Sequence, residues 1–304
     1  MTVQEIFSQI ADENAKLPQS LTRTKEPEQV TSAPGSVNDY QAMMKTNITA
    51  NYAIAIDLIA RTRGPGRDRV LDLCCGPGHV TLCLQKYLNY KNLKGLDLSA
   101  GMIAAAQENL RQENLGKNVS FALGDAAKLD HEPVKTFDLV SFTNAAHHFP
   151  DLNAVTSVIK QAERVVKSDG LIFISDLARL KSDVVTQKFV AFAGADYGDF
   201  MREDFLNSMR AAWLPEELAS AVPDSTHRTW YSVAFGGLPF FQALIGLPEG
   251  RQELFLNPSF DWPGVGIFPN PAAHEAFLFM KACLDAGNFR KIQHEAERAM
   301  RRAS

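Results

Sequence analysis

Apolar runs and amphipathic segments alternate regularly between residues 69 and 175 of this chain. Short runs rich in Val, Leu, Ile and Phe predict strands at 69–73, 93–98, 119–123, 139–143 and 171–175. Apolar residues recur at helical spacing over 80–88, 100–115 and 152–166. Strands that alternate with helices form a parallel sheet covered on both faces. The pattern therefore predicts an α/β fold with a doubly wound sheet, in which ligands bind at the carboxyl ends of the strands.

The remaining sequence flanks this alternating region on both sides. Residues 1–35 read as a polar leader or cap segment with a short helix near 3–15, and apolar residues at helical spacing over 37–63 predict a helix before the first strand. We assign 36–180 to the core domain. Residues 181–304 form a C-terminal part with helical patterns and a cluster of aromatic residues between 230 and 268.

Composition and charge narrow the class of protein. The chain has 304 residues, 45% of them hydrophobic, with a net charge of −4 at pH 7, so no charge excess favours nucleic acid or an anionic membrane. No apolar run has membrane-spanning length and the start lacks a signal-peptide pattern, so we expect a cytoplasmic location. The four cysteines (Cys74, Cys75, Cys83, Cys283) form no CxxC pair. We expect reduced packing residues and no metal site.

The stretch from Val70 to Val80 carries the strongest chemical signal. An apolar run containing Asp72 ends in Cys74-Cys75-Gly76-Pro77-Gly78, and an amphipathic helix begins at once. A strand, a glycine turn and a helix N-terminus bring backbone N–H groups up to an anionic group. The Asp72 carboxylate would repel a phosphate, whereas a ligand with an ammonium beside a carboxylate suits both features. S-adenosylmethionine is such a ligand.

Three more polar residues follow the predicted strands. Asp97 closes the second strand, where an acid reaches the hydroxyls of a bound ribose. Asp125 follows Gly124 after the third strand, where a carboxylate accepts from an adenine amine, and Asn144 follows the fourth. Asp72, Asp97 and Asp125 would thus meet the methionyl, ribosyl and adenyl groups in succession.

On these residues the chain resembles class I S-adenosylmethionine-dependent methyltransferases, and more narrowly the small-molecule enzymes of the ubiquinone/menaquinone-biosynthesis type. The similarity spans roughly residues 50–180, including 70–78, 93–99, 121–126, 137–149 and 162–176. The resemblance implies the Rossmann-like class I fold, S-adenosyl-L-methionine as cofactor and S-adenosyl-L-homocysteine as product. The implied cofactor contacts are Asp72, Cys74, Gly76, Gly78, Asp97, Leu98, Met102, Gly124, Asp125, Ala126 and Asn144.

Two features depart from the family pattern. Cys74 stands at the family's first glycine, which is tolerable if its backbone conformation is ordinary. The family ends in an antiparallel hairpin of the sixth and seventh strands, but only 228–233 offers a candidate strand. We therefore expect an N-terminal helical cap and an atypical helical and aromatic C-terminal extension, which completes the sheet and forms the acceptor pocket.

The expected reaction is methyl transfer to a small-molecule acceptor at O, N, S or an activated carbon. In-line displacement depends mainly on positioning, with a general base where the nucleophile carries a proton of high pKa. His147 and His148 follow the fourth strand and are the candidate bases as neutral imidazoles; alternatively, one packs against the next turn and the other is solvated. Candidates for the acceptor pocket are Tyr52, Asp176, Tyr197, Trp230 and Tyr231. The aromatic cluster could equally form a core or a dimer contact.

Other functions compete with this one. A protein that binds S-adenosylmethionine without methylating, cyclase-like or regulatory, would carry the same cofactor motifs. A protein or RNA methyltransferase is less favoured, because residues 143–146 lack the Asn/Asp-Pro-Pro-aromatic loop and no basic face is evident. A dehydrogenase would need a GxGxxG fingerprint. We expect a small-molecule partner, no nucleic acid and no membrane, and leave a homodimer open.

Overall fold

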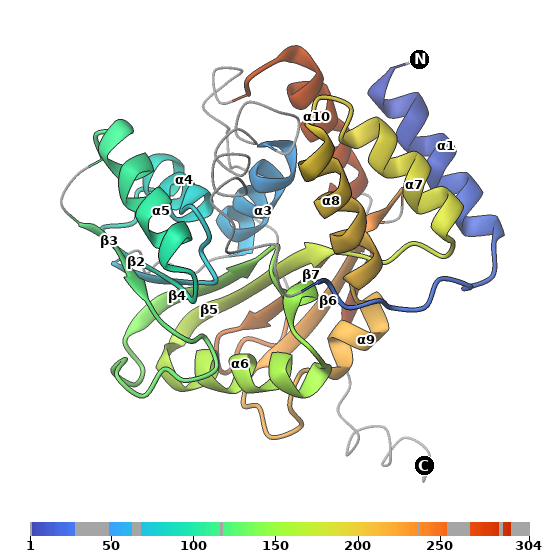
Figure 1. The fold of residues 1–304 in the computed structure, drawn as a ribbon. Helices are drawn as coiled ribbons and strands as arrows, with labels where there is room; N and C mark the ends of the chain where they lie inside the picture. The colour runs from blue at the N-terminus through green and yellow to red at the C-terminus, as the bar shows by residue number, and fades with distance from the viewer. Residues whose placement is uncertain are drawn as a thin grey trace, which may run out of the picture.

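The computed structural model describes residues 2–27, 49–62, 68–115, 118–235, 237–253, 268–285 and 288–292. Within these residues, eight strands form one mixed sheet in the order β3-β2-β1-β4-β5-β7-β6-β8 (Figure 1). The strands are β1 (Arg69–Leu73), β2 (Asn92–Asp97), β3 (Val119–Leu123), β4 (Phe137–Thr143), β5 (Val166–Leu177), β6 (Thr229–Phe235), β7 (Leu238–Leu247) and β8 (Asn288–Lys291).

The first five strands are parallel, which confirms the predicted doubly wound sheet. β1 pairs with β2 and β4, β2 pairs with β3, and β4 pairs with β5. Helices α4 (His79–Leu88) and α5 (Ala100–Gln112) lie on one face of the sheet and α6 (Leu152–Val165) on the other (Figure 1). Because both faces are covered, β1 and β4 are almost entirely buried and read as continuous apolar runs.

The C-terminal part contains the hairpin that sequence analysis did not find. β6 and β7 pair antiparallel, and β7 pairs antiparallel with β5. The expectation of an atypical extension is therefore wrong at this edge of the sheet. β7 is buried along nearly its whole length, so its sequence shows no apolar–polar alternation that would mark it as a strand. β8 adds a further strand outside β6.

Five helices gather on the α4 side of the sheet, beyond the carboxyl ends of the parallel strands (Figure 1). They are α1 (Val3–Lys16), α3 (Thr49–Thr62), α7 (Asp183–Ala193), α8 (Asp199–Ala211) and α10 (Pro271–Asp285). A short helix, α9 (Pro215–Ser220), has proline in its first turn, where the missing N–H costs no hydrogen bond. Buried side chains of α1, α3, α7 and α10 join those of α4, β5 and β7 in one apolar cluster. Every helix in the described part of the chain is too short or too polar to cross a membrane.

The segment that follows α1 packs across the molecule as far as residue 27. The N–H groups of Ser20 and Leu21 donate to the Lys181 carbonyl at 2.8 and 2.9 Å. The Arg23 guanidinium donates to the carbonyl oxygens of His147 (3.0 Å), Phe149 (2.8 Å) and Ala211 (2.7 Å). The rest of the leader, the predicted helix before residue 49 and the basic end at 298–302 lie outside the described residues.

Candidate active site

The turn after β1 is built from residues with left-handed backbone conformations. Cys74, Gly76 and Gly78 have φ angles of 52°, 51° and 80°. A Cβ on Gly78 would lie 2.6 Å from the Phe121 ring, so only glycine fits there. The condition stated for a cysteine at position 74, an ordinary backbone conformation, is not met. A side chain in this region costs roughly 1–2 kcal/mol, which the surrounding turn and sheet must offset.

Asp97 connects the end of β2 to this turn. Its Oδ2 accepts a hydrogen bond from the Gly76 N–H at 2.9 Å, and its Oδ1 accepts one from the Ser99 N–H at 2.8 Å. An ionised carboxylate offers about four acceptor positions, so capacity remains for two hydroxyl donors. The geometry is compatible with the predicted contact to a ribose.

A cavity of about 780 Å³ opens at the carboxyl ends of the strands, and we call it the strand-end cavity. The turn after β1, the start of α5 and the loop after β4 line it. Leu98, in its wall, is 70% exposed and offers an apolar surface to a flat ring. The predicted cofactor contacts that line it are Cys74, Gly76, Asp97, Leu98, Met102 and Asn144.

Asp72 does not line this cavity. Its side chain is buried, with Oδ1 accepting from the Ser141 hydroxyl at 2.7 Å and Oδ2 from the Thr81 hydroxyl at 2.5 Å. Burial raises the pKa of the Asp72 carboxyl to about 6, although the two hydroxyl donors oppose the rise. Asp72 therefore joins β1, β4 and α4 instead of facing a ligand's ammonium group directly.

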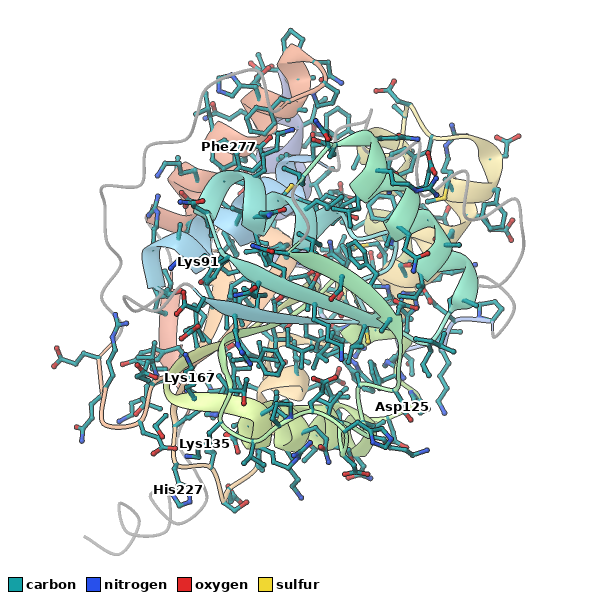
Figure 2. All side chains as sticks on the ribbon, turned by 90° about the vertical axis from the view of Figure 1, so that its left-hand side faces the viewer. Lys91, Asp125, Lys135, Lys167, His227 and Phe277 are labelled. Carbon is teal, nitrogen blue, oxygen red and sulfur yellow. The ribbon has the colours of Figure 1, made fainter. Side chains whose placement is uncertain are left out.

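The other predicted contacts lie just beyond the cavity wall. Gly124, Asp125 and Ala126 follow β3, and the Asp125 Oδ1 accepts from the Ala127 N–H at 2.9 Å. Figure 2 shows Asp125 at the opposite end of the sheet from Lys135 and Lys167. It thus shares the sheet edge of the strand-end cavity without lining it. Gly78 begins α4 and is likewise not part of the lining.

A second cavity, of about 160 Å³, lies among α1, α3, α7, α8 and α10, and we call it the apolar cavity. Its wall is mainly apolar, and the Phe189 and Phe240 rings stack with centroids 4.1 Å apart. Tyr197, predicted for the acceptor pocket, lines it. The aromatic residues of the wall are Phe7, Tyr52, Phe189, Phe192, Tyr197, Phe205 and Phe240.

The two cavities adjoin. Tyr52, Asn144 and His148 line both of them. Asn144 has a φ of 50°, a conformation that asparagine tolerates, and its Oδ1 accepts from the Asn51 amide at 3.2 Å. Burial raises the pKa of the Tyr52 hydroxyl, so that group stays protonated. The two cavities therefore share part of one wall.

His147 and Asp176 form a buried pair beside the apolar cavity. Asp176, at the end of β5, accepts from the His147 backbone N–H at 2.7 Å and lies 2.6 Å from its Nδ1. Burial would lower the pKa of His147, but the charges of Asp176 and Glu26 outweigh it and raise that pKa to about 9. At neutral pH the ring is protonated, which is the reverse of the neutral imidazole expected from the sequence.

Glu26 is the residue that sequence analysis missed. It contacts the His148 Nδ1, its Oε1 lies 3.8 Å from the His147 Nε2, and it accepts from the Ser208 hydroxyl at 2.5 Å. Burial would raise the pKa of Glu26, but the two histidines hold it down at about 2. Glu26 lies in the polar leader, far from the histidines in sequence and outside any motif, so no pattern could have identified it.

Two residues proposed for the acceptor pocket lie elsewhere. The Trp230 indole is fully buried on the α6 side of the sheet and donates to the Thr226 hydroxyl at 3.1 Å. The Tyr231 hydroxyl donates to the Gln252 carbonyl at 3.0 Å. Neither lines a described cavity wall. Phe255, Phe260 and Trp262 of the aromatic cluster lie outside the described residues.

The four cysteines are free and partly buried, as expected. Burial raises the pKa of the Cys74 and Cys75 thiols and raises that of Cys83 to about 12. These three remain protonated at neutral pH. They are packing residues, because the thiolate is the form that attacks or binds a soft metal ion.

The sequence region that forms most of the strand-end cavity is similar to known proteins. A family model described as "Methyltransferase domain" matches residues 70–170. A demethylmenaquinone methyltransferase of Lactobacillus johnsonii is 32% identical over 119 residues, which are 39% of this chain and 47% of that protein. A 2-phytyl-1,4-naphtoquinone methyltransferase of Synechococcus elongatus is 32% identical over 124 residues, 40% of this chain and 51% of that protein. The chain thus spans about half the length of these curated relatives.

Solved structures agree on the fold. The plantazolicin methyltransferase BpumL, in complex with S-adenosylhomocysteine, is similar over 80% of this chain and 99% of its own, with a TM-score of 0.53 and 13% identity. Its relative BamL is similar over 92% of each chain, with a TM-score of 0.52 and 17% identity. These comparisons show that residues 70–170 are similar to a methyltransferase domain and that the chain shares its fold with solved methyltransferases.

Proposed function

We propose that this protein transfers a methyl group from S-adenosylmethionine to a small molecule bound in the apolar cavity. The observation that carries the proposal is the junction of the two cavities at Tyr52, Asn144 and His148. The cofactor occupies the strand-end cavity, with its ribose on Asp97 and its adenine beside Leu98 and Met102. Its methyl group then faces the junction, where an acceptor in the apolar cavity meets it.

The wall of the apolar cavity indicates the class of acceptor. Aromatic and apolar side chains suit a largely apolar, flat molecule, because they replace its contact with water and stack on its rings. A cavity of about 160 Å³ takes a small molecule or a single side chain and has no room for a folded domain or an RNA strand. We therefore assign acceptor binding to the cap helix α1 and to the C-terminal helices α7, α8 and α10.

The histidine pair suits an acceptor that reacts as an anion. The sulfonium of the cofactor already activates the methyl group, so the protein's task is to align the acceptor and exclude water. A cationic His147 beside the cavity stabilises a phenolate, an enolate or a similar oxyanion on the acceptor. In this scheme His147 is the catalytic residue and Asp176 is the positioning residue that holds its ring.

The named relatives suggest a first acceptor to try and do not identify it. Two of them carry the names of quinone methyltransferases. The family match, however, ends at residue 170, whereas the apolar cavity draws most of its wall from residues 3–52 and 177–280. A reduced demethylnaphthoquinone therefore belongs among the test acceptors, beside simpler phenols and enols.

Transfer of labelled methyl groups tests the proposal. The protein is incubated with methyl-labelled S-adenosylmethionine and a host extract, and the label is measured separately in the small-molecule and macromolecular fractions. Titration with S-adenosylhomocysteine shows that the preparation binds cofactor, and Asp97→Ala serves as the control impaired in binding. Label in the small-molecule fraction is the expected result. Label in protein or RNA would overturn the acceptor class, and tight cofactor binding without transfer to any test acceptor would favour a non-methylating role.

A further inference from the structure

Three side chains at the edge of the apolar cavity place metal-binding atoms together. One carboxylate oxygen of Glu26 and one ring nitrogen each of His147 and His148 lie within 4.8 Å of one another. Two histidines and one carboxylate are a donor set that divalent transition metals accept. We propose that Glu26, His147 and His148 bind a divalent transition-metal ion, for which Zn²⁺ is the first probe. The sequence predicts no such site, because Glu26 reaches the histidines only in the folded chain.

The orientation of His147 matches that of a metal ligand. Its Nδ1 lies 2.6 Å from the Asp176 carboxylate, which leaves Nε2 facing the Glu26 Oε1 at 3.8 Å. A metal-binding histidine usually donates its other ring N–H to a carboxylate or a carbonyl, which holds the ring in the required tautomer. Asp176 fills that role here and is itself completely buried.

The separation of the His147 and Glu26 donor atoms requires little movement of these two ligands. In a tetrahedral zinc site with bonds of about 2.0–2.1 Å, neighbouring donor atoms lie roughly 3.3 Å apart. The His147 Nε2 and Glu26 Oε1 are 3.8 Å apart, so a shift of about half an ångström suffices. The His148 Nδ1 already contacts the second Glu26 oxygen, and its ring is 32% exposed and can rotate toward the others.

The local charge also favours a divalent cation. The carboxylates of Glu26, Asp176 and Asp204 act on His147, and all three side chains are nearly buried. Two described cations lie close to Glu26 in the chain: Lys25 is exposed, and Arg23, whose charge acts on Glu26 and Asp176, uses its guanidinium donors for backbone carbonyls. With both histidines neutral, as metal binding requires, negative charge is in excess, and a cation would offset it.

The position of this cluster gives the metal a task in the reaction. His147 and His148 line the apolar cavity together with Ser208 and Asp204. A metal ion with three protein ligands keeps a position for a further ligand, here on the cavity side. An acceptor would fill it with an oxygen that loses its proton more easily when bound to the metal. This task rests on the proposed methyl transfer, but in it the ion takes the place of the cationic His147 ring, because a ring that binds metal through Nε2 is neutral. Metal binding itself does not rest on the proposed function.

Zinc binding to the untagged full chain, without cofactor or acceptor, tests the site. After removal of bound metal with a chelator, calorimetric titration with Zn²⁺ should show one ion per chain, and Co²⁺ should give a visible absorption band. Glu26→Gln and His148→Asn should each weaken binding at least about tenfold. Asp176→Asn should weaken it by about 10- to 100-fold. His227→Asn is the control, because His227 is exposed and lies in the loop before β6.

The outcomes separate this inference from the proposed function. Absence of zinc binding, or binding that is unchanged in both Glu26→Gln and His148→Asn, overturns the metal site. If Glu26→Gln does not fold, His148→Asn decides alone, because its partly exposed ring is not needed for packing. Methyl transfer by a protein that binds no zinc would overturn the metal site and leave the proposed function intact. Zinc binding without methyl transfer would support the metal site and overturn the proposed function.

Discussion

The strand-end cavity and the apolar cavity differ in how the chain builds them. The strand-end cavity takes nearly all of its wall from residues 74–102 and 143–150, in segments that directly follow β1, β2 and β4. The apolar cavity collects residues from positions 3 to 280, on helices from both ends of the chain. The first is therefore a local product of strand–turn–helix units. The second exists only when five helices pack together.

The family model matches the sequence around one cavity and not around the other, although the shared fold extends over most of the chain. The family match covers residues 70–170, which hold the strand-end cavity and the loop that bears the two histidines. The helices around the apolar cavity lie almost entirely outside that range. Under the proposed function, acceptor binding falls to parts of this chain that the family match does not include.

The largest expected effect is on turnover, from a change in the apolar cavity. His147→Asn removes the cationic ring, while the new amide can still donate to Asp176. We expect kcat to fall by about 10²- to 10⁴-fold. The Kd for S-adenosylhomocysteine should change less than about twofold. Single-turnover kinetics and calorimetry measure the two values. A His147→Asn variant with full turnover would mean that the ring has no part in the reaction.

A change in the strand-end cavity should instead weaken the binding of S-adenosylhomocysteine. Asp97→Ala removes the carboxylate that would accept from the ribose hydroxyls, and two hydrogen bonds to a charged group contribute about 3 kcal/mol or more. We expect the Kd for S-adenosylhomocysteine to rise about 100-fold, measured by calorimetry. Asp125→Ala is the matched control, since Asp125 shares the sheet edge without lining the cavity. An equal loss in both variants would show that adenine recognition matters as much as the ribose contact.

The buried Asp72 carboxyl should make the unfolding free energy of the protein depend on pH. Its folded pKa of about 6 exceeds the ordinary 3.8, so the folded state holds the proton more tightly than the unfolded chain does. The stabilising contribution is full below about pH 4 and is lost as the pH rises through 6. The difference in unfolding free energy between wild type and Asp72→Asn should change by about 2–3 kcal/mol between pH 4 and 7 in urea titrations. A difference that stays constant over this range would contradict the raised pKa.

Filling the apolar cavity should affect acceptor binding alone. Ala193, at the end of α7, lines this cavity and is half-buried, so Ala193→Phe places a ring in the space. We expect the acceptor KM to rise about tenfold, or about 1.4 kcal/mol, with the cofactor Kd unchanged. Ala193→Ser is the control of similar size. If cofactor affinity fell as much as acceptor affinity, the two cavities would not be separate binding sites.

The smallest expected effect concerns the turn after β1. Cys74→Gly relieves the left-handed conformation of residue 74, although glycine loses more entropy on folding. The net gain in unfolding free energy should be below about 1 kcal/mol, measured by urea denaturation. Cys75→Gly is the matched control and should destabilise, because Cys75 has no positive φ to relieve. Destabilisation by Cys74→Gly would indicate that packing of the Cys74 side chain outweighs its strain.

Sequence patterns were informative where the interactions are local. Asp97 was predicted from its distance to the glycine turn, and in the structure it accepts from the Gly76 N–H and lines the strand-end cavity. β7 escaped detection because a strand buried on both faces loses its alternating pattern. Trp230 was misplaced for a related reason: it points to the α6 face, whereas Phe240 on the neighbouring strand lines the apolar cavity. Aromatic content alone does not say which face a side chain takes.

The sequence by itself determined the parallel sheet and the strand–turn–helix unit after β1, and it predicted S-adenosylmethionine as the cofactor. Those features depend on periodicity and on residues within one strand–turn–helix unit, where steric rules act between neighbours. Only the tertiary structure decided the apolar cavity, the left-handed conformation of Cys74 and the meeting of Glu26 with His147 and His148. The chain must bring residue 26 across the loop that follows β4, and it does so through Arg23 and Ser208, whose contacts form between segments that lie far apart in sequence.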